Sequence, residues 1–367
     1  MTSLDDLTAL REHAFRWVDQ AYGEAHERAG RGLAEGYAPG MAAEIAGQGW
    51  LAVMVGAQNG GMGGGLREMA AVMEAVGRGL VAEPVLSQGA IAAPLLDRLG
   101  TPQARLLLAR VLDGTSVTVM MHQEADAGFE RTLASSRLTE EDGRFHIHAA
   151  KAPVLDAAGA KILLVTALDA AGRTAVVAIE ADAPGVRLVR SRSVDGRMLA
   201  AVHLDHVAVP ADAVLNAGAD ASAIVETVLE EAALLVCSEA CGAIPILVEG
   251  TADYLRTRRQ FGMPLASFQV LQHRMVDMLL AAEEASAVVE AALDSADGPE
   301  RKRAFALAKI VTARSARFVA QQAVQLHGGI GMTDDLKVSR YFRRLMQCET
   351  MFGDADWHAE RFDRLRG

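Results

Sequence analysis

The spacing of apolar residues changes twice along the chain, and this constrains the fold more than any other feature of the sequence. Up to about residue 117 the spacing is helical, with apolar residues three and four positions apart in Met41–Leu51 and Leu66–Leu80. Residues 118 to 216 instead carry short runs rich in Val, Ile, Leu and Thr between turn signals. Helical spacing then returns and holds to the end, so the sequence predicts an α+β protein with domains at residues 1–117, 118–216 and 217–367.

The expected elements of the last two domains follow from the same patterns. Because no helix separates the short runs, they predict a small antiparallel β-barrel or sandwich. These runs are Arg144–Ala150, Lys161–Leu168, Thr174–Ala181 and Ala201–Val209. The last domain has helical patterns long enough for a four-helix bundle. They are Ala221–Gln260, Phe268–Ser295, Glu300–Leu326 and Leu336–Met351.

Composition excludes several classes of protein. With 51% hydrophobic and 23% charged residues the chain is globular, and its net charge of −11 without a basic stripe argues against nucleic-acid binding. The three cysteines, Cys237, Cys241 and Cys348, predict a reducing, cytoplasmic location and ordinary helix packing rather than a metal site. No uncharged stretch approaches the ~18–20 residues that span a bilayer, so no membrane insertion is expected.

Two glycine-rich segments have different expectations. Gly60–Gly65 lacks both the preceding strand and the following Gly-Lys-Ser/Thr of a phosphate-binding loop, so it predicts a plain loop. Gly328 and Gly329 follow a long helical pattern and would let backbone N–H groups approach a phosphate without a Cβ in the way. Taken alone, this pair is better explained as a helix C-cap, and Arg258 as half of a surface ion pair.

The last third of the chain closely resembles the C-terminal domain of acyl-CoA dehydrogenases. It contains an R-x-x-F-G motif, a following glutamine and a Q-x-x-G-G turn. The resemblance implies the acyl-CoA dehydrogenase fold over essentially the whole chain, with FAD shared at a subunit interface. It also implies a set of residues that bind the pyrophosphate and adenosine of a neighbour's FAD. These are Arg258, Phe261, Gln269, Gln325, Gly328 and Gly329.

The segments that hold a subunit's own flavin in the family have changed. The family's T-E-P-x-A-G-S-D segment aligns with residues 123–130, where Gln123 replaces the threonine and Phe129 the serine that contact FAD. The family's K-x-W-I-T segment aligns with residues 151–155, where Pro153 replaces the tryptophan and Leu155 the threonine. By this resemblance, the ring-holding half of the flavin site is missing.

The usual catalytic base is also absent, since Phe352 stands where most family members carry a glutamate. Asp354 stands two residues later, where its carboxylate would repel the pyrophosphate. Some members carry the base on the first long helix of the last domain, and that position falls on Ala232. Glu230 and Glu231 are weak alternatives, because a shift of one or two residues turns a side chain by ~100–200° around a helix.

The motifs that are retained and those that are lost predict a subunit that completes the FAD site of a second, acyl-CoA dehydrogenase-like subunit. That second subunit would supply the base. The pattern resembles heterotetrameric bacterial acyl-CoA dehydrogenases of steroid side-chain or dicarboxylate degradation. The expected substrate is an acyl-CoA, oxidised by α,β-desaturation, with electron-transfer flavoprotein or an equivalent acceptor. Two alternatives remain: a homotetrameric flavoenzyme with a displaced base or non-dehydrogenating chemistry, and a non-catalytic structural subunit.

Overall fold

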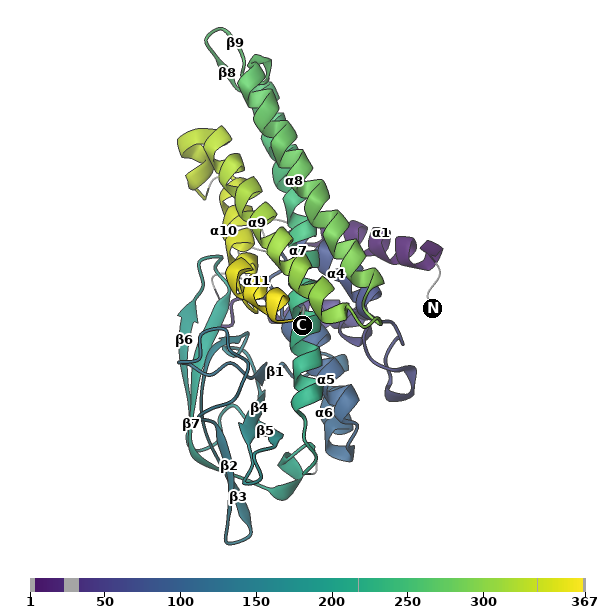
Figure 1. Cartoon of the computed structure of the whole chain (residues 1–367), viewed down its shortest axis with the longest axis vertical. Helices are drawn as coiled ribbons and strands as arrows, with labels where there is room; N and C mark the ends of the chain where they lie inside the picture. Colours follow the sequence, from purple (N-terminus) through teal and green to yellow (C-terminus); the bar gives the residue numbers. More distant parts are fainter. Residues whose placement is uncertain (1–3, 23–32, 217, 335, 366–367) are drawn as a thin grey trace. The chain divides into compact units, whose positions relative to one another are not determined.

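The computed structural model describes residues 4–22, 33–216, 218–334 and 336–365 (Figure 1). Contacts within the chain define two compact units. Unit 1 comprises residues 1–23, 70–81 and 233–367, and unit 2 comprises residues 24–69 and 82–232. The predicted start of the third domain, residue 217, lies outside the described residues, and the three-domain division stays a prediction.

The helices that precede the sheet in unit 2 are short. They are α3 (Pro39–Gly47), η1 (Trp50–Ala52), η2 (Ala57–Asn59), the start of α4 (Leu66–Gly79), the π-helix η3 (Val85–Ala92), α5 (Ala93–Leu99) and α6 (Pro102–Leu112). The helix expected at Met41–Leu51 stops at Gly47, because Gly49 adopts a left-handed φ of 78°. Gly60–Gly65 is a loop, as predicted.

Unit 2 also holds a seven-stranded sheet in the order β1-β4-β2-β3-β7-β6, with β5 paired to β4. Its strands are β1 (Thr118–Met121), β2 (Arg137–Glu141), β3 (Arg144–Leu155), β4 (Ile162–Leu168), β5 (Thr174–Glu180), β6 (Val186–Arg192) and β7 (Met198–Val209). The expectation of an antiparallel domain is wrong at two pairs, because β4 runs parallel to both β1 and β2. Strands β2 and β3 lie between β1 and β4 in the sequence. This connection lets β4 start at the same end of the sheet as β1 and pair with it in parallel.

Unit 1 is helical and contains the four long helices expected from the sequence. They are α7 (Ser222–Thr257, whose first turns belong to unit 2), α8 (Gln269–Asp294), α9 (Arg301–His327) and α10 (Lys337–Thr350). Unit 1 adds α1 (Leu4–Ala21), most of α4, the short turn η6 (Gly328–Met332) and α11 (Ala355–Arg364). Helix α9 packs against α8, α10 and α11 and so forms the centre of this unit.

The first long helix was expected to reach Gln260 but ends at Thr257. Arg259 and Gln260 instead form strand β8 (Arg259–Gln260), which pairs with β9 (Met263–Pro264) in a small hairpin. Figure 1 shows this hairpin projecting beyond the ends of α7 and α8. By length and composition α7 could also cross a membrane, but 78% of its apolar window is buried, so packing already accounts for its hydropathy.

Polar bonds and close backbone contacts hold unit 1 together. The Arg344 guanidinium of α10 donates to both carboxylate oxygens of Glu239 in α7, at 2.7 and 2.6 Å, and both side chains are buried. A Cβ at Gly77 of α4 would lie 1.8 Å from the Glu239 carbonyl oxygen, and one at Gly242 would lie 1.9 Å from that of Glu74. Only glycine therefore permits α4 and α7 to approach this closely.

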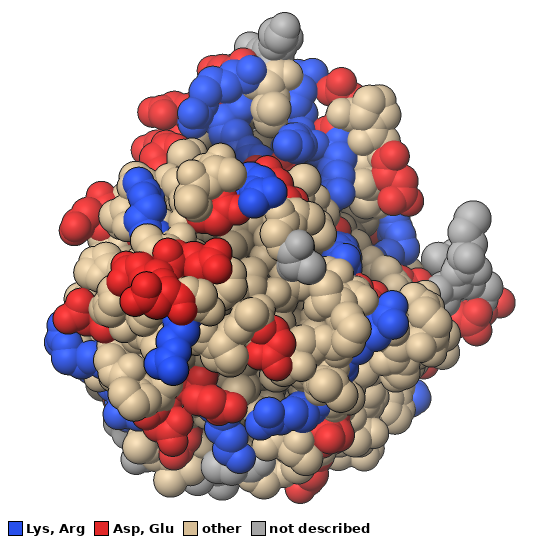
Figure 2. Space-filling model, turned by 90° about the horizontal axis from the view of Figure 1, so that it is seen from below, with Lys and Arg blue, Asp and Glu red and all other residues tan. Residues whose placement is uncertain are grey.

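Charge is mixed on the surface drawn in Figure 2. Acidic and basic side chains are interspersed over most of that face, so the net charge of −11 is not concentrated in one acidic patch there.

Candidate functional site

The R-x-x-F-G motif forms the β8–β9 hairpin. Arg258 follows the last residue of α7, and its backbone oxygen accepts a hydrogen bond from Leu265 N–H at 2.8 Å, which closes the hairpin. Phe261 and Gly262 form the turn with φ angles of 52° and 82°. Two consecutive positive φ values are typical of a tight type I′ turn. The turn leaves the Phe261 side chain 87% exposed.

The Q-x-x-G-G motif ends helix α9. Gly328 has φ 68° and ψ −153°, a conformation that essentially only glycine adopts. A Cβ built on Gly328 or Gly329 would meet no atom within 4 Å. Gly328 is therefore explained by its backbone conformation, whereas packing within the described chain explains neither glycine. Gln325 and both glycines are exposed.

Two aromatic side chains bring the first and third motifs together. The Tyr254 hydroxyl donates to the backbone oxygen of His327 at 3.3 Å, and the two rings stack with centroids 4.3 Å apart. His327 is buried, which lowers the pKa of its imidazole, and its Nδ1 lies 2.8 Å from the Ala323 oxygen. His327 thus packs against Tyr254 and hydrogen-bonds within its own helix.

All six predicted FAD-binding residues belong to unit 1 and are exposed. Among the residues that the structure describes, no side chain pairs with the Arg258 guanidinium. Gln269 is the first residue of α8 and follows the hairpin directly. The arrangement presents one free cation, one aromatic ring and a glycine turn, which are groups that recognise a phosphate and a planar ring.

In unit 2, the segment with Pro153 is a structural part of the sheet. The register of β3 against β7 shifts between Lys151 and Val154, so Ala152 and Pro153 form a bulge. Pro153 is exposed, whereas Val154 lies in the apolar core of the unit. Gln123 is partly buried, and its backbone oxygen accepts a hydrogen bond from Ala152 N–H at 3.1 Å. A backbone hydrogen bond therefore joins the two altered segments, residues 123–130 and 151–155.

A buried ion pair joins the same two segments. Lys151 Nζ donates to the His122 backbone oxygen at 2.9 Å and lies 3.8 Å from Glu124 Oε1. Burial lowers the pKa of Lys151 to about 7, although the Glu124 charge raises it. For Glu124, burial alone would raise the pKa. Hydrogen bonds from the backbone N–H groups of residues 134–136 outweigh this and lower the pKa to about 2.

His122 completes this polar cluster, which sequence reasoning missed. Its Nε2 donates to the Arg131 backbone oxygen at 2.7 Å, and its Nδ1 lies 2.9 Å from Thr166 Oγ1. Burial, and then repulsion from Lys151, lower the pKa of His122 to about 4, so the ring is neutral at pH 7. His122 immediately precedes the altered 123–130 segment, and its separation of 44 residues from Thr166 leaves no local signal in the sequence.

Glu231 and Asp354, two of the three carboxylates considered as a base, each have a partner in their own unit. Both oxygens of Glu231 are 2.8–2.9 Å from the Arg98 guanidinium, and Glu230 is 4% exposed. Asp354 caps helix α11 by accepting a hydrogen bond from Trp357 N–H at 2.8 Å. Phe352 has a left-handed φ of 59°, and its backbone oxygen accepts from His358 Nε2 at 3.0 Å. The arrangement gives Glu231 and Asp354 structural roles.

Family profiles match most of the described sequence. "Acyl-CoA dehydrogenase, N-terminal domain" matches residues 5–115 and "Acyl-CoA dehydrogenase, C-terminal domain" matches residues 222–364. The chain belongs to the acyl-CoA dehydrogenase family. Family members are oxidoreductases that act on CH–CH bonds of acyl-CoA thioesters, and the predicted fold is confirmed.

Among characterised acyl-CoA dehydrogenase relatives, acryloyl-CoA reductase (NADH) of Anaerotignum propionicum is 28% identical over 315 residues, 82% of this chain and 79% of that protein. A variant of the Tcur3481–Tcur3483 steroid ACAD superposes with a TM-score of 0.88 and 26% identity, covering 98% of this chain and 97% of that one. The ChsE4–ChsE5 complex from Mycobacterium tuberculosis gives a TM-score of 0.89 at 24% identity, over 99% and 97% of the two chains.

Proposed function

We propose that this chain is one subunit of a heteromeric acyl-CoA dehydrogenase and completes the FAD site of a partner subunit that supplies the catalytic base. One observation carries the proposal. The residues that bind a neighbouring subunit's FAD in the family all lie exposed on unit 1. Packing within the described chain does not account for them, most plainly for the Phe261 ring, which is 87% exposed. An exposed aromatic beside a free guanidinium is typical of a binding surface.

The residues present fit one half of FAD and not the other. Arg258 would bind the pyrophosphate through charge-assisted hydrogen bonds, and the Gly328–Gly329 backbone would approach it. Phe261, Gln269 and Gln325 would surround the adenosine side. The isoalloxazine half does not fit, because exposed Pro153 in the β3 bulge replaces the family's tryptophan, and proline has no backbone N–H to donate.

The reaction removes a proton from Cα and a hydride from Cβ of the acyl-CoA, and FAD accepts the hydride when bound. The base would come from the partner. Within this chain Phe352 stands at the usual position, Glu231 is held by Arg98, and Asp354 caps a helix. This chain's own residues would bind and orient the cofactor.

Heteromeric assembly is supported by the likeness to the 26% identical steroid ACAD Tcur3481–Tcur3483, whose name joins two proteins. On that likeness we favour a steroid side chain as the acyl group, with a dicarboxylate as the second choice. Electrons would pass to electron-transfer flavoprotein or an equivalent acceptor, in the cytoplasm.

The test is the visible spectrum and flavin content of this chain, purified alone and then co-expressed with an adjacent acyl-CoA dehydrogenase-like gene. We expect no flavin in the chain alone, and one FAD for each pair of unlike chains in an active complex. A yellow, active homo-oligomer with one FAD per chain would overturn the proposal.

Substitution of Arg258 distinguishes a functional FAD-binding site from motifs that are retained only for structural reasons. Arg258→Ala removes a charge-assisted bond worth about 1.5–3 kcal/mol, so the complex should hold FAD roughly 10- to 150-fold more weakly. Arg256→Ala is the matched control, because Arg256 is an exposed arginine two residues away that pairs with Asp253 at 2.8 Å. Equal FAD retention in both variants would support a purely structural subunit.

A further inference from the structure

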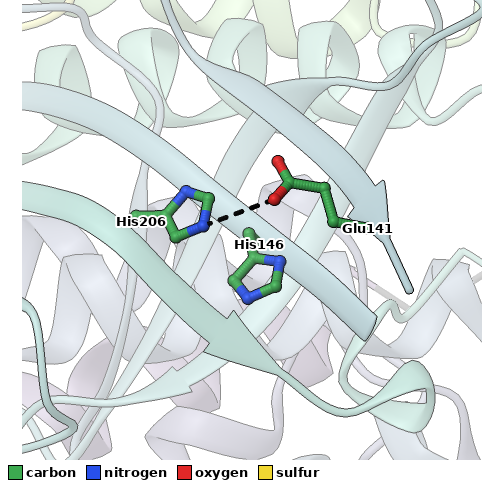
Figure 3. A group of neighbouring side chains, drawn as sticks. All are labelled: Glu141, His146 and His206. Carbon is green, nitrogen blue, oxygen red and sulfur yellow. Dashed lines mark ion pairs between the residues drawn. The ribbon is translucent and has the colours of Figure 1, made fainter. Parts of the chain in front are cut away.

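Glu141, His146 and His206 meet on the surface of the sheet in unit 2, and none of them is among the candidate FAD-binding residues or the altered flavin segments (Figure 3). They come from three strands: Glu141 ends β2, His146 lies in β3 and His206 in β7. One nitrogen or oxygen atom from each lies within 4.8 Å of the others, and His206 Nε2 is 3.6 Å from Glu141 Oε2. Within the described ranges, no other trio of histidine, cysteine and acidic side chains is placed to share a metal ion.

A β-bulge places His206 in this group. Strands β3 and β7 pair Ile147 with Val207 and then Ala149 with Leu204, so two residues of β7 face one residue of β3. Such bulges re-aim side chains. In this position His206 has a left-handed φ of 51°, which is uncommon for a residue other than glycine. Because Leu204 and Val207 are both buried, the bulge turns the intervening His206 outward.

The other two side chains are also oriented. The Thr139 hydroxyl donates to Glu141 Oε1 at 3.4 Å, which leaves Oε2 toward His206. His146 Nδ1 is inaccessible to solvent, yet it has no hydrogen-bond partner among the described residues. The His146 and His206 rings stack 4.2 Å apart and nearly parallel, at 12° (Figure 3). A buried acceptor without a partner and an oriented carboxylate are what a metal ligand set provides.

We propose that Glu141, His146 and His206 bind a divalent transition-metal ion of the zinc type. Imidazole and carboxylate ligands bind zinc at about 2.0–2.2 Å, so tetrahedral ligand atoms lie about 3.3 Å apart. The 3.6 Å between His206 and Glu141 already approaches this spacing. Two imidazoles plus a carboxylate favour Zn²⁺, Co²⁺, Ni²⁺ or Cu²⁺, whereas Mg²⁺ and Ca²⁺ prefer oxygen ligands.

Binding requires one change in the side chains. Two parallel stacked rings cannot both direct an in-plane nitrogen lone pair at one ion, so one ring must rotate out of the stack. His206 is free to do so, because its side chain is 60% exposed. The rotation also closes the longer ligand separations, and water completes the coordination of the ion.

The test uses the full chain without a polyhistidine tag, titrated with ZnCl2 in a calorimeter. We expect one ion per chain and an affinity at least about tenfold lower in His206→Asn and in Glu141→Gln, since even outer-shell losses weaken metal sites 10–100-fold. Asparagine tolerates the left-handed conformation at position 206, and Glu141 is an exposed strand end, so both variants should fold.

His203→Asn is the matched control, because His203 lies on the same strand but outside the group. It should bind zinc like the unmodified chain. No zinc binding up to millimolar concentration, or equal affinity in all four proteins, would overturn the proposal and leave a stacked histidine pair with an ordinary surface ion pair. The outcome is independent of the FAD experiments.

Discussion

Truncation of Phe261 to alanine distinguishes a contact made within the chain from one made with a partner. Within the chain the ring is 87% exposed and meets Phe268 edge-on, with centroids 6.0 Å apart. Such a pair contributes about 0.5–1.5 kcal/mol, so the free energy of unfolding of the lone chain should fall by about that much. Burying a phenylalanine fully against a partner contributes about 1.5–3 kcal/mol, so the dissociation constant of the complex should rise roughly 10- to 150-fold.

Two measurements are needed on the same variant. Sedimentation of the complex over a dilution series gives its dissociation constant, and denaturant unfolding of the lone chain gives its stability. Alanine retains the cost of the left-handed φ of 52° at position 261, so both values report on the ring alone. Phe261→Leu is the control, because leucine keeps most of the apolar area and should weaken the complex by less than about tenfold.

The reasoning would be refuted if the complex assembled with unchanged affinity while the lone chain lost more than about 2 kcal/mol. Phe261 would then stabilise the hairpin itself, and the proposal that the hairpin serves a neighbouring subunit would lose its main support.

Three further predictions concern buried charges. Arg344→Met leaves the Glu239 carboxylate, which is 0% exposed, without its cation. The free energy of unfolding in urea should therefore fall by about 3–5 kcal/mol, and a fall of less than about 1 kcal/mol would contradict this. Lys151 has a folded pKa of about 7 against 10.5 when unfolded, so the unfolded chain binds the proton more tightly and stability should rise between pH 7 and 10.5. At about 1.4 kcal/mol per pH unit the rise is at most about 5 kcal/mol, and a pH-independent stability difference between the chain and Lys151→Met would oppose it. Glu231→Gln should leave activity of the complex nearly unchanged, because Arg98 holds this carboxylate; a loss beyond about 100-fold would make Glu231 the base.

The sequence predicted the long helices well and the small strands poorly. Helices α8 and α9 have enough turns for the spacing of apolar residues to show their limits within a few residues. Strand β6 was missed because its alternate residues include exposed arginines and few apolar side chains. The error at Gln260 has a different cause: the turn depends on a left-handed φ at Phe261, which residue propensities disfavour.

Motifs in the sequence located the candidate site, but not its environment. The R-x-x-F-G and Q-x-x-G-G patterns named the two segments, and only the structure shows that the Tyr254–His327 contact joins them. The partner of Glu231 could not be predicted, because Arg98 is 133 positions away and an ion pair formed by folding leaves no local pattern. The same reason hid the bonds that Lys151 makes to the segment before residue 125.

The physical costs in the β8–β9 hairpin argue that its binding partner lies outside this chain. A phenylalanine with a left-handed φ carries backbone strain of about 1–3 kcal/mol, and exposing its ring forgoes about 1.5–3 kcal/mol of apolar burial. Glycine at position 261 would remove the strain, and a polar residue would remove the exposed apolar surface. Among the residues that the structure describes, Phe261 makes an edge contact with Phe268 and remains 87% exposed, which offsets neither cost. Burial against a second subunit, as proposed, would offset both costs. Arg258, which pairs with no side chain among the described residues, would then supply a cation for a phosphate bound to that subunit.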